Sequence, residues 1–167
     1  MTSSTCCAAG AITGVTTWVI VGSQAILGAV ANAPAELLVS QEVDLYAPAD
    51  EAASDLVDGS IGEKSPFHET FGYYAHGVGE KTAILPSRWR ERAVVIQTPA
   101  TRGVAGICPD PVDIAISKMA AWREKDQDFV RLLVKSHIVT VDAIRFRLHE
   151  LDEENAMRIT DRLRRLS

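Results

Sequence analysis

The sequence predicts an α/β (α+β) protein, in which a small mixed sheet of about four or five strands has helices on one face and is followed by a helical C-terminal segment. Two features predict this class. A strand–helix–strand unit occupies residues 18–46, and two apolar strands followed by amphipathic helices occupy residues 93–166. A chain of 167 residues, with 47% hydrophobic and 23% charged residues, is typical of one globular domain.

The strand–helix–strand unit begins with the apolar run WVIV at residues 18–21. A tight turn at Gly22 and Ser23 is expected to open a short helix over residues 24–30, and an irregular connection around Pro34 leads to the second strand. Backbone N–H groups at such a turn attract anions such as phosphate. A Gly-Ser pair after a strand is also an ordinary turn, so the pair alone is weak support for a site.

The second strand carries two acidic residues, Glu42 and Asp44. Alternation along a strand places Val43 and Leu45 on one face and both carboxylates on the other. Carboxylate oxygens are hard ligands that suit Mg²⁺. Such a pair is often only a solvated strand face. Beside the Gly-Ser turn, however, it predicts a site where a divalent cation meets a phosphate.

The segments that flank this unit are assigned from periodicity and composition. Residues 1–10 show no periodicity and are expected to be loose. Residues 50–61 have the apolar spacing of a helix, and the aromatic run at residues 71–75 is expected to form a strand. The chain is therefore expected to alternate strand and helix between residues 18 and 75.

Three ionisable residues flank the aromatic strand. His68 and Glu69 lie just before it and are possible additions to the site. The simpler interpretation is that His68 makes a local hydrogen bond and that Glu69 is solvated. His76 follows the strand and is the weaker candidate.

The second half begins with residues 93–97 and 104–108, which are expected to form an antiparallel pair of strands. Asp110 is a typical N-cap and is followed by proline, which favours the first position of a helix. Further helices are expected over residues 127–135 and, as two charged amphipathic stretches, within residues 141–166.

Lys118 lies among apolar residues of the helix that follows Asp110, including Met119 and Trp122. A lysine in such surroundings either extends its ammonium to water or is held at a site by an acid or a phosphate. The pattern leaves both interpretations open.

Charge and cysteine usage limit the class of protein. The net charge of −5 argues against a general nucleic-acid binder. Residues 1–70 contain nine acidic residues and one basic residue, whereas residues 71–140 contain ten basic and seven acidic residues, which suits a site with metal on one wall and phosphate on the other. Three cysteines without C-x-x-C spacing predict a reduced, cytoplasmic setting.

The uncharged N-terminal stretch, residues 1–35, raises the question of export or membrane insertion. A signal peptide needs a basic start, which this stretch lacks. Polar residues such as Ser23, Gln24 and Asn32 also interrupt any membrane span. A soluble protein with no membrane association is expected.

Five segments, within about residues 19–133, resemble the minimal nucleotidyltransferase superfamily: VGSQAILG, APAELLVSQEVDLY, SPFHETFGYYAHGVG, TPATRGVAGICPDP and SKMAAWREKD. Within it, the chain is most similar to an uncharacterised bacterial family of about this length. It is distantly similar to the AbiEii-type toxin nucleotidyltransferases, which share the order G-S, D-x-D, lysine and R-x-K-D. The resemblance implies a nucleotidyltransferase-like domain over residues 1–140, with a helical segment, residues 141–167, packed on it.

The resemblance also implies roles for the first two motifs. Gly22, Ser23 and Gln24 would bind the nucleotide phosphates, and Glu42 and Asp44 would hold Mg²⁺ (or Mn²⁺). The first acid departs from the usual pattern, because nucleotidyltransferases more often have Asp where this chain has Glu42.

The remaining site residues are implied by the second half of the resemblance. Lys118, Arg123 and Lys125 would contact the triphosphate, and Asp126 would be a third catalytic acid or the partner of Lys118. No third carboxylate on a neighbouring strand is evident, and Glu69 and Asp110 are positional candidates only.

The function implied is transfer of NMP from an NTP to a hydroxyl of RNA, such as tRNA, or of a protein. In the toxin version of this function, the protein acts in a toxin–antitoxin or phage-defence system with a partner antitoxin. The alternative is a catalytically inactive member that binds nucleotide or a protein partner as a regulatory module. Glu42 and the missing third carboxylate favour this alternative.

Overall fold

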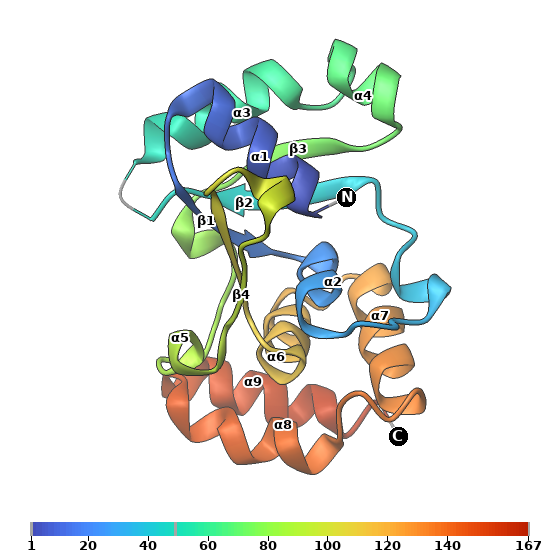
Figure 1. Ribbon diagram of the computed structural model, residues 1–167. Coiled ribbons are helices and arrows are strands. Elements are labelled where there is room, and N and C mark those ends of the chain that lie inside the picture. Colours follow the sequence, from blue (N-terminus) through green and yellow to red (C-terminus); the bar gives the residue numbers. More distant parts are fainter. Residues whose placement is uncertain (1, 49, 167) are drawn as a thin grey trace.

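A computed structural model describes residues 2–48 and 50–166. Its strands form one mixed sheet in the order β3-β2-β1-β5-β4 (Figure 1). The strands are β1 (Thr17–Val21), β2 (Glu42–Tyr46), β3 (Tyr74–Gly77), β4 (Val94–Ile96) and β5 (Ala105–Cys108). This sheet, with helices packed around it, confirms the predicted α/β class.

The pairing of the strands fixes which side chains become neighbours. Strand β1 runs antiparallel to β2, with Val21 opposite Asp44, and parallel to β5. Strand β3 is parallel to β2, with Asp44 opposite His76. Strands β4 and β5 are antiparallel, as predicted. The end of β1 and the middle of β2 and β3 therefore meet in one region.

The helices lie at both ends of the molecule. Helices α1 and α3 lie beside the sheet, and α6 to α9 gather at the opposite end (Figure 1). The helices are α1 (Thr2–Thr13), α2 (Ile26–Ala29), α3 (Glu51–Ile61), α4 (Pro66–Phe71), α5 (Trp89–Arg92), α6 (Pro111–Ala121), α7 (Glu124–Lys135), α8 (Val141–Arg147) and α9 (Glu153–Leu163). Within the described ranges, no helix has the length and apolarity to cross a membrane.

The two faces of the sheet are covered differently. Trp18 and Ile20 of β1 belong to the main core, which includes α1, α3 and the C-terminal helices. Val19 and Val21 point to the opposite face and join a smaller cluster with Trp89 of α5. Glu42 and Asp44 lie on this second face, because Val43 and Leu45 of the same strand enter the main core. Only part of the second face is thus closed by apolar packing.

The prediction that residues 1–10 are loose is wrong for residues 2–10, and residue 1 lies outside the described residues. Helix α1 packs against α3 and buries Cys6 and Ala9. An ideal Cβ at Gly106 of β5 would lie 2.9 Å from the Cys6 sulfur, so the helix approaches the sheet closely. Small residues allow this contact without producing an amphipathic period, so the sequence pattern does not predict this helix.

The predicted strand at residues 71–75 begins only at Tyr74. Residues before it form α4, where the Ser65 side chain accepts the N–H of His68 and Pro66 takes the first helical position. Gly72, with φ 72°, ends the helix in the left-handed conformation. These are ordinary start and stop signals, and the aromatic composition obscured them. His68 and Glu69 therefore lie on a helix.

A network of ion pairs ties the C-terminal helices to the rest of the chain. Arg92 of α5 lies 3.1 Å from Asp113 of α6 and 2.8 Å from Glu150. Arg147 of α8 lies 3.0 Å from Asp113 and also pairs with Asp110. Burial raises the pKa of Asp113 despite these two arginines. The C-terminal segment thus packs on α6 through charged as well as apolar contacts.

Candidate functional site

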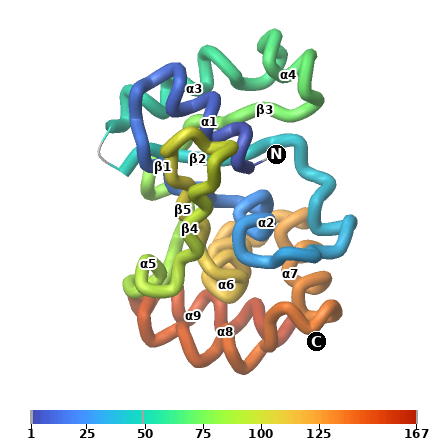
Figure 2. Tube along the Cα trace, in the orientation of Figure 1, coloured from blue at the N-terminus to red at the C-terminus, as the bar shows by residue number. Residues whose placement is uncertain are grey.

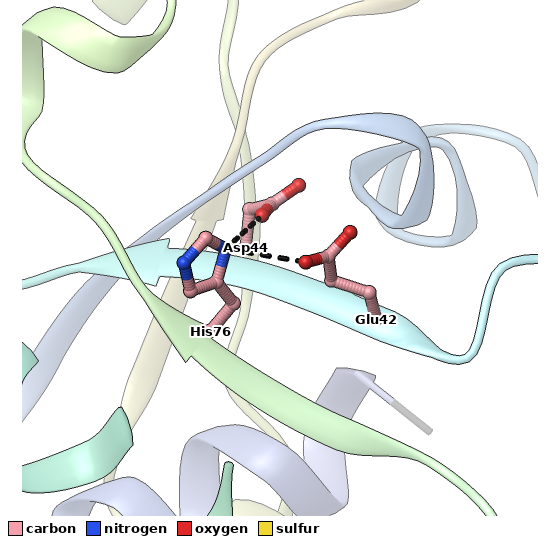
Figure 3. Close-up of side chains that lie close together, drawn as sticks. All are labelled: Glu42, Asp44 and His76. Atoms are coloured by element: carbon pink, nitrogen blue, oxygen red, sulfur yellow. Dashed lines mark hydrogen bonds and ion pairs between the residues drawn. The ribbon is translucent and has the colours of Figure 1, made fainter. Parts of the chain in front are cut away.

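The centre of the candidate site is a cluster of Glu42, Asp44 and His76. The two carboxylates come from β2 and the imidazole from the neighbouring β3 (Figure 3). His76 Nδ1 lies 3.2 Å from Glu42 Oε1 and 3.1 Å from Asp44 Oδ1. One ligand atom from each of the three residues lies within 4.8 Å of the others. Two carboxylates and an imidazole this close together form a donor set that fits a divalent cation.

The turn after β1 brings backbone against this cluster. Gly22 has φ 72° and ψ −164°, a conformation that favours glycine. An ideal Cβ on Gly22 would lie 2.3 Å from Asp44 Oδ2. The register explains this approach, because Val21 lies opposite Asp44 in the sheet. Glycine is therefore required at this position by its backbone angles and by the nearby carboxylate.

Gly22→Ala is expected to lower the free energy of unfolding by about 1–3 kcal/mol, the scale of a side chain forced into a glycine-only conformation. The added methyl also displaces the Asp44 carboxylate, so divalent-cation affinity should fall. Urea unfolding and Mn²⁺ titration measure the two effects. Gly59→Ala is the matched control, because an ideal Cβ at Gly59 meets nothing within 4 Å. A Gly22→Ala protein as stable as wild type would contradict this account.

Two other motif residues of the turn point in different directions. Ser23 begins a short 3₁₀ turn and lines the cavity described below. The Gln24 side chain is fully buried, and its Nε2 donates to the carbonyl oxygen of Ser40 at 2.5 Å. Gln24 therefore ties the turn to the chain that leads into β2. Its predicted contact with nucleotide stays a prediction.

Lys118 of α6 is nearly buried and is held by an acid. Its Nζ lies 3.1 Å from Oδ1 of Asp126, and Arg123 Nε lies 2.7 Å from Oδ2 of the same carboxylate. Asp126 is fully buried at the start of α7. Burial alone would raise the pKa of Asp126, but the hydrogen bond from Arg123 and the Lys118 ammonium lower it below its usual value. Of the two sequence interpretations, the ammonium held by an acid is the one observed.

These elements surround one cavity of about 710 Å³. This volume lies within the range of small-molecule sites, about 300–1,000 Å³. Its polar lining includes the predicted residues Gly22, Ser23, Glu42, Asp44, Lys118, Arg123 and Lys125, together with His76. Its apolar lining includes Leu37, Phe129 and Leu132. The 3₁₀ turn Ala35–Leu37 packs against α7 (Figure 2). Leu37 on the turn and the two apolar residues on α7 therefore lie on elements that support each other.

Five predicted candidates lie outside this lining: the fully buried Gln24 and Asp126, described above, and His68, Glu69 and Asp110. His68 accepts the N–H of Lys64 through Nδ1 at 3.0 Å, which is the local hydrogen bond considered from the sequence. Glu69 is exposed on α4. Asp110 caps α6 by accepting the N–H groups of Val112 and Asp113, and it pairs with Arg147. The capping and ion-pairing bonds of Asp110 explain its position without a part in the site.

His76, the weaker candidate from the sequence, lies against both carboxylates in the structure. It lies on the same face of β3 as Tyr74, two residues earlier, and its position opposite Asp44 depends on β3 pairing with β2. The only signal in the sequence is this alternation, which identifies a face but not the neighbouring strand.

Comparison with protein-family models places this architecture in a known group. Residues 11–165 match the model of a family described as "Nucleotidyltransferase of unknown function (DUF6036)". The chain belongs to this family. No curated protein and no solved structure matches the chain.

The nucleotidyltransferase family agrees with the predicted resemblance and with the geometry of the cavity. A nucleotidyltransferase takes a nucleoside triphosphate as substrate and usually uses a divalent cation. The donor atoms of Glu42, Asp44 and His76 fit such a cation. The distant similarity to AbiEii-type toxins stays a prediction.

Proposed function

We propose that the cavity binds an NTP with a divalent cation and that the protein transfers the NMP group to a hydroxyl of RNA or protein. One observation carries the proposal. In a chain of the nucleotidyltransferase family, the Gly22 turn, the Glu42–Asp44 pair and Lys118 come from three separate elements and line one cavity. Each is the kind of group that the reaction requires at the triphosphate.

Each group has a separate task in this proposal. Backbone N–H groups at Gly22 and Ser23 face the phosphates, and Lys118 and Arg123 neutralise their charge. Glu42 and Asp44 hold the cation, which when bound stabilises charge on the phosphate oxygens. The acceptor oxygen bonds to the α-phosphorus. The bond from the α-phosphorus to the oxygen that bridges to the β-phosphorus breaks, and pyrophosphate leaves with that oxygen. The acceptor proton passes to a nearby base or to water.

The apolar wall of the cavity suits the remainder of the nucleotide. Leu37, Phe129 and Leu132 line the cavity with side chains that can pack against a base or ribose. Arg123, just before α7, and Lys125, in the first turn of α7, add basic side chains to the lining. The NTP is thus expected to bind with its triphosphate toward β2 and the start of α7, and its base toward Phe129 and Leu132 in the middle of α7.

Label transfer tests the proposal directly. The protein is incubated with each α-labelled NTP, with Mg²⁺ or Mn²⁺, and with total tRNA in one arm and cell protein in the other. Labelled RNA or labelled protein, absent from an Asp44→Asn preparation, is the expected result. The arm that carries label distinguishes an RNA acceptor from a protein acceptor. Label in neither arm would count against transfer.

A second function, nucleotide binding without transfer, is favoured by one specific observation. The residue beside the two carboxylates on the neighbouring strand is His76, where a third carboxylate would strengthen the case for transfer. In this version the protein binds NTP and acts on a protein partner, as a regulatory or antitoxin module. NTP binding without label transfer to either acceptor would support it. The toxin–antitoxin or phage-defence role, with a partner antitoxin, would require transfer to be observed.

A further inference from the structure

We propose that His76 is a direct ligand of the bound cation, and that the site formed with Glu42 and Asp44 prefers first-row transition-metal ions to Mg²⁺. The inference rests on the proposed function for the role of the ion in NTP binding. Its test, however, uses the metal alone, so that this inference and the proposed function can be refuted separately.

The distances support direct coordination by all three residues. Adjacent ligands that each lie roughly 2.1 Å from one ion are about 3.0–3.4 Å apart in octahedral or tetrahedral geometry. His76 Nδ1 is 3.2 Å and 3.1 Å from the nearest oxygens of Glu42 and Asp44. Figure 3 shows the imidazole turned toward both carboxylates from the adjacent strand. The ligand atoms of Glu42, Asp44 and His76 all lie within 4.8 Å of one another, so adjustment of these side chains is enough to place all three around one ion.

The backbone holds these ligands in place. Glu42 pairs with Tyr74 and Asp44 pairs with His76 in the parallel β2–β3 ladder. Strand positions are more precise than loop positions, so the three donors keep their mutual separation. The His76 side chain is 47% exposed, which leaves the donor set accessible to an ion from solvent. The sheet register, rather than a flexible loop, thus selects the imidazole as the third donor.

The choice of donor atoms determines which ion is preferred. Mg²⁺ favours oxygen ligands and keeps several waters, whereas an imidazole nitrogen suits first-row transition metals. A third carboxylate would have added a negative charge that favours a hard ion. His76 replaces that charge with a nitrogen donor. Both differences lower the affinity of the site for Mg²⁺ relative to its affinity for ions such as Mn²⁺ and Co²⁺.

Metal binding without nucleotide tests the inference. Mn²⁺ affinity is measured by EPR of the free ion, and Mg²⁺ affinity by competition. Wild type is expected to bind Mn²⁺ at least about tenfold more tightly than Mg²⁺. His76→Ala should lower Mn²⁺ affinity by roughly 10–100-fold and change Mg²⁺ affinity little. His76→Asp should bind Mg²⁺ more tightly than wild type and lose the preference for Mn²⁺.

Pulsed EPR identifies the ligand itself. Coupling of bound Mn²⁺ to an imidazole ¹⁴N is expected in wild type and should disappear in His76→Ala. His149→Ala is the matched control, since this histidine is exposed near the end of α8, and it should retain the coupling. Absence of imidazole coupling in wild type, its survival in His76→Ala, or equal wild-type affinity for both ions would overturn the inference.

The metal experiment and the transfer experiment can fail independently. Nitrogen-coupled Mn²⁺ binding without label transfer would overturn the transferase proposal and support His76 as a ligand. Label transfer with no nitrogen coupling would support the transferase proposal and overturn the assignment of His76 as a ligand. Circular dichroism of His76→Ala checks its folding. The nitrogen coupling of wild type is measured without a variant, so a folding defect in His76→Ala does not affect that result.

Discussion

Asp44→Asn and Glu42→Gln are each expected to abolish divalent-cation-dependent NTP binding while leaving the fold intact. Each change keeps the size of the side chain and removes the negative charge that holds the cation. The two carboxylates share one face of β2, so removing either charge relieves their mutual repulsion. Stability should therefore hold or rise, which separates loss of the site from loss of the fold.

Titration of each NTP in the presence of Mg²⁺ or Mn²⁺, together with thermal unfolding, measures these effects. Glu69→Gln is the matched control, because Glu69 is an exposed carboxylate on α4 that lies outside the cavity lining. This variant should bind NTP as wild type does. Unchanged NTP binding by both Asp44→Asn and Glu42→Gln would refute the metal-site assignment.

Lys118→Met is expected to weaken NTP binding by about 1–3 kcal/mol, which corresponds to roughly 5- to 150-fold in Kd. This is the scale of a charge-assisted hydrogen bond to phosphate, and the substitution keeps the apolar stem of the side chain. Lys118 lines the cavity, and its ammonium is held by Asp126 at 3.1 Å. The salt bridge keeps that ammonium in position before a triphosphate binds.

A second variant separates the loss of charge at the phosphate from the loss of the salt bridge. Lys118→Met leaves the buried Asp126 with Arg123 as its remaining cationic partner, so some stability should be lost. Adding Asp126→Asn removes the buried negative charge and should restore part of that stability. NTP affinity should remain low in the double variant. Recovery of affinity together with stability, or wild-type affinity in Lys118→Met, would contradict a phosphate contact by Lys118.

The sequence predicted correctly those features that depend on residues close together along the chain. Alternation along β2 placed Glu42 and Asp44 on one face, and the structure has Val43 and Leu45 on the other. Asp110 and the proline after it predicted the start of α6 correctly. In each case the determining contacts lie within a few residues along the chain.

Composition predicted the wrong structure in two places, one decided by long-range packing and the other by local helix caps. Helix α1 lacks an amphipathic period, and it forms because small residues let it pack closely on α3 and β5. The aromatic residues of α4 suggested a strand, but a local N-cap and Gly72 define a helix. The start and end of α4 are thus encoded in local residues, whereas α1 depends on its packing partners.

The same distinction between local signals and tertiary contacts applies to the candidate site. The sequence by itself determined the Gly22 turn, the carboxylate pair of β2 and a lysine in apolar surroundings. Only the tertiary structure decided that His76 faces Asp44, that Asp126 holds Lys118, and that Asp110 caps a helix instead of joining the site. The physical reason is that side-chain period determines which face of an element a residue occupies, while strand pairing and helix packing determine what that face meets.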